Sequence, residues 1–131
     1  MSEPRRKYVI LIADDRPSSR ELLRVILERA GYDVLEAEDG EAALQQIHLR
    51  EPDLVLLDLQ MPKLDGLAVL QAVRSDPRFG QLPIIALTAS AMRGDRERIL
   101  EAGFTGYLAK PAGPELLRDT VAKLLDEKPA S

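Results

Sequence analysis

The chain has 131 residues, enough to bury one core but too few for two ordinary domains, and 45% of them are hydrophobic, as expected of a globular protein. Its 18 basic and 22 acidic side chains leave a net charge of −4, which argues against a nucleic-acid-binding surface. Cysteine is absent, which excludes thiolate metal sites and disulfides and fits a reducing, cytoplasmic compartment.

Short apolar runs of about five residues alternate with amphipathic stretches of about eleven to fifteen, a pattern typical of repeated strand and helix units. We expect five strands: Tyr8 to Ala13, Asp33 to Ala37, Leu54 to Leu57, Pro83 to Leu87, and Thr105 to Ala109. The first, third and fourth are apolar throughout, as expected for strands buried on both faces of a parallel sheet. The first run is also followed directly by two aspartates, so it is neither a signal peptide nor a membrane span.

Five helices are expected, delimited by prolines and glycines. They cover residues 17–30, 41–50, about 66–75, 91–102, and 114 onward. The first carries the apolar stripe Leu22, Leu23, Ile26 and Ala30, and the last turns Leu117, Val121 and Leu124 inward. This alternation predicts an α/β fold with a doubly wound parallel sheet, formed by residues 8–127 between tails at 1–7 and 128–131. No output domain is expected after this unit.

Polar side chains stand at the ends of several expected strands. Asp14 and Asp15 follow the first, Asp58 follows the third, Thr88 the fourth and Lys110 the fifth. In doubly wound sheets the ligand crevice lies beyond the carboxyl ends of the strands. Three carboxylates, one hydroxyl and one ammonium are therefore predicted to converge at one edge.

Such a carboxylate cluster predicts a site for Mg²⁺, or Mn²⁺. Magnesium takes one or two protein carboxylates directly, and Asp15 and Asp58 are the best candidates. Asp14 would act through a water or a second hydrogen-bonded layer, and the backbone carbonyl of Gln60 could complete the protein's share. Beside the cation, Asp58 could attack a phosphorus atom, while Lys110 and Thr88 stabilise the charge on the phosphoryl oxygens.

Together these residues resemble a known family. The motifs are Asp14-Asp15, Asp58 in the frame Leu-Leu-Asp-Leu-Gln-Met-Pro, Thr88-Ala89, Tyr107, and Lys110-Pro111. They resemble the receiver domain of two-component response regulators, and the match extends from about Tyr8 to Leu125. Between Thr88 and Glu101 the sequence is most similar to stand-alone receivers of the DivK type and to receivers attached to hybrid kinases.

The resemblance implies a flavodoxin-like sheet of strand order 2-1-3-4-5, as the chemotaxis regulator of this family has. It implies that Asp58 is the phosphoacceptor, with Lys110 as the partner of the phosphoryl group. Thr88 and Tyr107 would form the switch that remodels the face of the fourth helix, fifth strand and fifth helix. It also implies a cis Lys110-Pro111 bond. Arg16 departs from the family pattern, because Asn or Glu is common at that position.

The resulting hypothesis is a single-domain regulator, monomeric or weakly dimeric, that accepts a phosphoryl group from a sensor histidine kinase or a phosphotransfer protein. It would turn over no substrate beyond Mg-dependent self-phosphorylation and slow self-dephosphorylation. Alternatives are a phosphate shuttle, a receiver cut from a hybrid kinase, an Asp-nucleophile phosphatase, and a receiver that is never phosphorylated. Gln60 argues against the phosphatase, since an amide cannot transfer the proton. His48, the only histidine, is predicted to lie on a solvated helix face.

Overall fold

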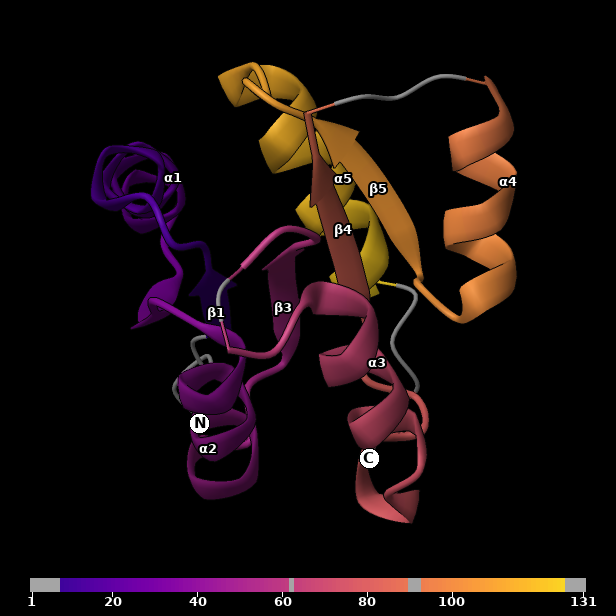
Figure 1. The fold of residues 1–131 in the computed structure, drawn as a ribbon. Helices are drawn as coiled ribbons and strands as arrows, with labels where there is room; N and C mark the ends of the chain where they lie inside the picture. The colour runs from indigo at the N-terminus through magenta and orange to yellow at the C-terminus, as the bar shows by residue number, and fades with distance from the viewer. Residues whose placement is uncertain (1–7, 62, 90–92, 127–131) are drawn as a thin grey trace.

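The central element is a sheet of five parallel strands (Figure 1). The structure is a computed structural model that describes residues 8–61, 63–89 and 93–126. The strands are β1 (Val9–Ala13), β2 (Asp33–Ala37), β3 (Leu54–Asp58), β4 (Ile84–Thr88) and β5 (Gly106–Ala109). The helices are α1 (Pro17–Arg29), α2 (Gly40–Arg50), α3 (Gly66–Arg74), α4 (Arg93–Ala102) and α5 (Pro114–Asp126), with a short 3₁₀ helix η1 (Pro77–Phe79). All the predicted elements are present.

The strand order is β2-β1-β3-β4-β5, as the family resemblance implied. Every neighbouring pair is parallel, so each connection crosses a face of the sheet through a helix. The predicted strand ends shift slightly: Asp58 and Thr88 are the last residues of β3 and β4, not the first residues beyond them. The order reverses beside β1 and β3, which places the predicted crevice there.

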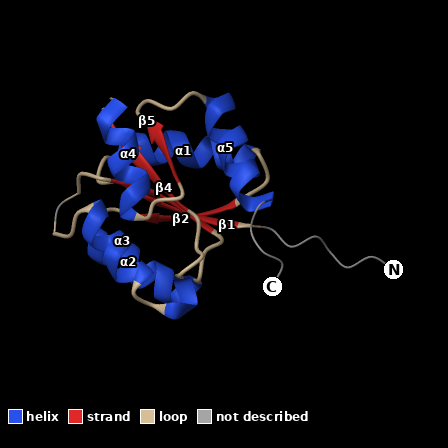
Figure 2. Cartoon of the chain, turned by 90° about the vertical axis from the view of Figure 1, so that its right-hand side faces the viewer, coloured by secondary structure: helices blue, strands red, loops and turns tan. Residues whose placement is uncertain are grey.

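Helices cover both faces of the sheet, as the side view in Figure 2 shows, and an apolar layer lies between the sheet and each set of helices. On one face, Leu11, Val55 and Leu57 pack against buried residues of α2, α3 and α4. On the other face, Ile10 and Ile12 pack against α1 and α5. Alternate residues of the same strands therefore enter opposite layers, which explains why β1, β3 and β4 contain no polar residue before their ends.

The predicted inward stripes of two helices need correction. In α1, Leu23 and Ile26 are buried, but Leu22 is 52% exposed and Ala30 is also exposed. Leu22 lies on the wall of the cavity at the carboxyl edge of the sheet, and Ala30 caps the end of α1. In α5, Leu117 and Val121 are fully buried as predicted. The third buried position is Leu125, while Leu124 is only half-buried. The predicted start of α4 at Ala91 lies outside the described residues.

Helix ends follow local capping rules. The side chain of Asp39 accepts a hydrogen bond from Ala42 N at the start of α2, and Asp65 accepts one from Ala68 N at the start of α3. Gly103, with φ of 116°, ends α4 in the left-handed conformation that glycine adopts without strain. The two aspartate caps satisfy backbone N–H groups that the helix starts would otherwise leave without a partner.

Two glycines bring backbone segments into close contact below the carboxyl edge of the sheet. A Cβ atom on Gly66 would lie 2.6 Å from the carbonyl oxygen of Asp58, and one on Gly40 would overlap the carbonyl of Leu64. Neither separation is sterically allowed, so both positions require glycine as the chain is folded here. Three backbone segments therefore lie in direct contact, without side chains between them: the start of α2, the β3–α3 loop and the end of β3.

Arg74, at the end of α3, ties together the opposite edge of the sheet. Its guanidinium donates to the carbonyls of Leu82 at 2.8 Å and Gly103 at 3.1 Å, and to that of Phe79 at 3.0 Å. All these acceptors are neutral, and burial lowers the pKa of Arg74. The side chain therefore works as a hydrogen-bonding hub joining α3, the strand entrance of β4 and the end of α4.

Among the described residues, no helix combines the length and the apolar character that crossing a bilayer would need.

Candidate functional site

The register of the sheet brings the predicted site residues together. Ala13 pairs with Leu57, so Asp14 follows β1 directly beside Asp58 at the end of β3. Thr88 pairs with Ala109, so Lys110 follows β5 at the same level, and its backbone N–H donates to the Thr88 carbonyl at 2.8 Å. Asp14, Asp15, Asp58, Thr88 and Lys110 thus meet at the carboxyl edge, as the sequence predicted.

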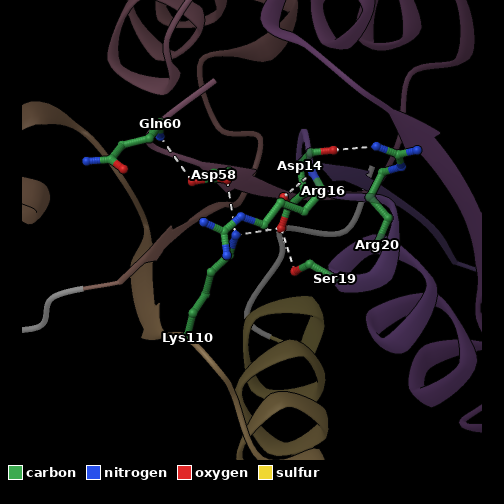
Figure 3. Close-up of polar contacts among 7 residues, drawn as sticks. All are labelled: Asp14, Arg16, Ser19, Arg20, Asp58, Gln60 and Lys110. Atoms are coloured by element: carbon green, nitrogen blue, oxygen red, sulfur yellow. Dashed lines mark hydrogen bonds and ion pairs between the residues drawn. The ribbon is translucent and has the colours of Figure 1, made fainter. Parts of the chain in front are cut away.

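Lys110 links two carboxylates that come from different strands (Figure 3). Its Nζ lies 2.6 Å from Oδ2 of Asp14 and 3.1 Å from Oδ2 of Asp58. Burial opposes the charged ammonium, but the hydrogen bonds to the two carboxylates outweigh it and raise the pKa of Lys110. The side chain is therefore fully protonated at neutral pH. The predicted cis bond between Lys110 and Pro111 is present.

Asp14 is fully buried and has a partner for each oxygen. Oδ2 accepts from the Ser19 hydroxyl at 2.6 Å as well as from Lys110, and Oδ1 accepts from Arg16 N at 2.9 Å. Burial alone would favour the neutral acid, yet the hydrogen bonds from Lys110, Ser19 and Arg16 N together lower the pKa of Asp14. The Arg20 guanidinium donates to the Asp14 carbonyl at 2.7 Å, which fixes the backbone here.

Asp58 is nearly as buried, but its electrostatic balance is different. Its Oδ1 accepts the backbone N–H of Gln60 at 3.0 Å, and its Oδ2 accepts from Lys110. Burial is the largest influence, and with the nearby charge of Asp14 it raises the pKa of Asp58 in spite of both donors. The Asp58 carboxylate is therefore poorly compensated by the protein alone.

The three carboxylates could hold a metal ion. One oxygen each from Asp14, Asp15 and Asp58 lie within 4.8 Å of one another, and Asp15 is exposed while the other two are buried. Oxygen ligands with a single lysine nearby suit a hard cation such as Mg²⁺. The raised pKa of Asp58 indicates that an additional positive charge would stabilise this cluster. The donor set therefore fits the predicted cation.

An open cavity of about 710 Å³ lies in front of these groups. The site residues Asp15, Asp58, Thr88 and Lys110 line it. Residues of α1, the start of the β3–α3 loop and the segment after the cis bond complete the wall, among them Arg16, Leu22, Gln60 and Pro111. The cavity is large enough for a phosphoryl group and a small group attached to it.

The two residues predicted to act as a switch occupy neighbouring strands. Thr88 ends β4 half-buried and lines the cavity. Tyr107 lies on β5, is half-buried, and packs against the layer formed by α2, α3 and α4. The Arg96 guanidinium of α4 lies 5.8 Å from the centre of the Tyr107 ring, within cation–π range. Their predicted role remains a prediction.

Two supporting residues were not predicted from the sequence, and the prediction for His48 was incomplete. Ser19 and Arg20 of α1 hold the side chain and the backbone of Asp14, but a serine and an arginine in a helix give no distinctive pattern. His48 is 43% exposed, yet its ring packs edge-on against Phe79 and lies 3.5 Å from Asp76, so its helix face is only partly solvated. It lies on α2, outside the cavity.

Residues 10–122 match the family model described as the response regulator receiver domain. The chain belongs to the response regulator receiver family. This membership agrees with the strand order, with the acidic cluster and with the position of Lys110.

Curated relatives of this receiver differ in length. This chain is 33% identical to the polar-differentiation response regulator DivK of Brucella anthropi, over 90% of its own length and 96% of DivK. It is 43% identical to the probable transcriptional regulator ycf27 of Galdieria sulphuraria, over 95% of this chain. The chain spans 48% of that regulator, and it spans 7% of hybrid signal transduction histidine kinase I of Dictyostelium discoideum, to which it is 38% identical.

Solved structures share the fold over nearly the whole receiver. A putative response regulator from Chloroflexus aurantiacus has a TM-score of 0.88 at 38% identity, covering 92% of this chain and 99% of that one. The receiver domain of a sensor histidine kinase from Pseudomonas aeruginosa has a TM-score of 0.85 at 33% identity, with the same coverage. That structure has a magnesium ion coordinated in its active-site cleft.

Proposed function

We propose that this receiver accepts a phosphoryl group on Asp58 from a histidine kinase or a phosphotransfer protein and then changes a protein-binding surface. The observation that carries the proposal is the position of Lys110, whose ammonium bridges Asp14 and Asp58 at 2.6 and 3.1 Å beside an open cavity. Family membership supports it.

The chemistry at Asp58 is an in-line displacement. A carboxylate oxygen of Asp58 forms a bond to phosphorus while the bond from phosphorus to the donor breaks, and the donor leaves with the electron pair. The backbone N–H of Gln60 and the ammonium of Lys110 orient the two carboxylate oxygens before the reaction. Lys110 and the hydroxyl of Thr88 then stabilise the negative charge on the transferred group.

We propose that Asp15 and Asp58, the carbonyl of Gln60 and, through a water, Asp14 hold Mg²⁺ in this site. The bound cation would neutralise the carboxylates and the phosphoryl oxygens. Support comes from the three clustered carboxylates and from the magnesium ion in the related Pseudomonas receiver.

The proposed output is a change at α4, β5 and α5. Thr88 would move toward the phosphoryl group and Tyr107 would turn inward, which alters the surface that a partner contacts. The proposal is supported by the position of Thr88 on the cavity wall and by the contact between Tyr107 and Arg96 of α4. A partner that binds the surface of α4, β5 and α5 could in this way detect the phosphorylation of Asp58.

The test is labelling with acetyl phosphate and Mg²⁺, followed by mass spectrometry. Wild-type protein should gain one phosphoryl group on Asp58, and Asp58→Asn should gain none. Asp119→Asn on the exposed face of α5 removes the same charge away from the cavity and should be labelled like wild type. Stoichiometric labelling of Asp58→Asn would overturn the proposal.

We further propose that the protein works as a single-domain regulator in the cytoplasm, with no turnover beyond self-phosphorylation and slow self-dephosphorylation. The 96% coverage of DivK favours this reading over a receiver within a hybrid kinase. An immunoblot of the native protein should show a species of about the same mass as this chain, and a much larger species would favour the hybrid kinase. Steady turnover of a phosphate ester would favour the phosphatase alternative.

A further inference from the structure

Arg16 is a cavity residue that the chemistry above does not use. Its side chain is exposed and lines the same cavity as Asp58, Thr88 and Lys110. Figure 3 shows the Arg16 side chain reaching from the end of β1 toward the space in front of Asp58 and Lys110. Within the described part of the chain, its guanidinium takes part in no hydrogen bond or ion pair.

The backbone of Arg16, in contrast, is held firmly. Its N–H donates to the Asp14 carboxylate at 2.9 Å, and its carbonyl accepts from Arg20 N at 3.0 Å as α1 begins. Arg16 occupies the position that precedes the first turn of α1, but its side chain makes no capping hydrogen bond. The structure thus fixes where the side chain begins and leaves its charged end available.

The other cation on the cavity wall is already engaged. Among the lining residues that the structure describes, Lys110 is the only other basic one, and its ammonium is shared between Asp14 and Asp58. Three carboxylates against one ammonium and the one proposed divalent cation leave no excess positive charge to attract an anionic phosphoryl donor. A planar guanidinium at the entrance offers two parallel N–H donors that match phosphoryl oxygens, which a single ammonium does not.

We propose that Arg16 binds the phosphoryl oxygens of an incoming anionic donor, with small acyl phosphates as the donor class, and favours donors that carry the greater negative charge. This proposal rests on the proposed function, because the reaction it influences is the phosphorylation of Asp58. An oxygen of Asp58 bonds to phosphorus, the bond from phosphorus to the acyl oxygen breaks, and a carboxylate leaves with the electron pair. Arg16 exchanges no proton in this step.

The experiment compares two donors and three variants in the full chain with Mg²⁺. Acetyl phosphate is a dianion at neutral pH, and phosphoramidate carries one negative charge fewer. The rate constant for Asp58 labelling is measured for wild type, Arg16→Gln, Arg16→Lys and Arg29→Gln. Arg29 lies at the far end of α1 and does not line the cavity, so its variant changes net charge equally and serves as the control.

We expect Arg16→Gln to lower the acetyl phosphate rate about tenfold, which corresponds to one lost charge-assisted hydrogen bond, and the phosphoramidate rate by a smaller factor. Its acetyl phosphate rate should depend less on ionic strength than the wild-type rate does. Arg16→Lys should retain part of the rate, and Arg29→Gln should stay within about twofold of wild type.

A second measurement does not depend on transfer. Acetonylphosphonate has the shape of acetyl phosphate but cannot donate its phosphorus, and it should shift the side-chain N–H signal of Arg16 in nitrogen NMR spectra. An unchanged acetyl phosphate rate in Arg16→Gln, or an equal loss with both donors, would overturn the role of Arg16. Absence of any labelling in wild type would instead refute the phosphoacceptor function itself.

Discussion

Replacing Asp58 by Asn should stabilise the protein when no divalent cation is present. The Asp58 carboxylate is buried with its oxygen near those of two other aspartates, and its pKa is raised by that burial. A group whose charged form is disfavoured in the folded state costs stability whenever it is ionised. Asparagine has nearly the same shape and can still accept the N–H of Gln60, which Asp58 accepts at 3.0 Å.

The magnitude follows from the distances. With an effective dielectric constant of about 20, Lys110 at 3.1 Å attracts the Asp58 carboxylate by about 5 kcal/mol. Repulsion from Asp14, at the limiting separation of 4.8 Å, is about 3.5 kcal/mol, and repulsion from the exposed Asp15 is screened to about 1 kcal/mol. These contributions nearly cancel, so the cost of burying the charge remains, and we expect Asp58→Asn to gain about 1 to 2 kcal/mol.

The assay is urea unfolding monitored by circular dichroism, in the presence of a chelator, at several pH values. Because the folded-state pKa of Asp58 is raised, the penalty in wild type is full at neutral pH and disappears as the pH falls through that pKa toward 3.8. The advantage of Asp58→Asn should therefore shrink on acidification. Excess Mg²⁺ should favour wild type, by about 2.7 kcal/mol at a hundredfold excess over its dissociation constant.

Asp119→Asn provides the control for a lost surface carboxylate and should change stability little. If Asp58→Asn were as stable as wild type or less stable at neutral pH without metal, the Lys110 ion pair would dominate and this electrostatic reasoning would be refuted.

Three further changes test the supporting residues. Arg74→Met should destabilise the fold by about 2 to 3 kcal/mol in urea unfolding, since several carbonyls lose their donor, and full stability of this variant would contradict its role as a hub. Arg20→Met should weaken Mg²⁺ binding about tenfold in an NMR titration by releasing the Asp14 backbone, and an unchanged affinity would show that Arg20 is dispensable. Lys110→Gln should raise the pKa of Asp14, measured by carbon NMR of its carboxyl group, because the main donor to that carboxylate is lost.

Much of the fold could be predicted because it is encoded locally. Unbroken apolar runs predicted strands buried on both faces, and Pro17, Gly103 and Pro114 marked helix ends. The site followed because strand ends in a parallel sheet must meet at one edge. The strand order itself came from the resemblance, since the periodicity of a strand does not say which neighbour it pairs with.

Contacts between distant segments could not be predicted. Arg74 donates to carbonyls that lie just before β4 and just after α4, and no sequence pattern marks a backbone carbonyl as an acceptor. Leu22 is exposed because it lines the cavity, and the pairing of Ser19 with Asp14 depends on the position of α1. The balance between burial and hydrogen bonding at Asp58 and Asp14 required their geometry as well.

The close backbone contacts at Gly66 and Gly40 also affect how a mutational scan of this protein would be interpreted. Gly66 packs against the backbone of Asp58, the proposed phosphoacceptor, and Gly40 packs against Leu64 in the β3–α3 loop, although neither glycine carries a functional group. One added methyl group at either position would displace the backbone at the end of β3 or in the β3–α3 loop, and with it the Asp58 carboxylate. A screen that scores only phosphorylation would therefore place these two glycines among the reactive residues, and only a parallel measurement of folding would separate steric from chemical importance.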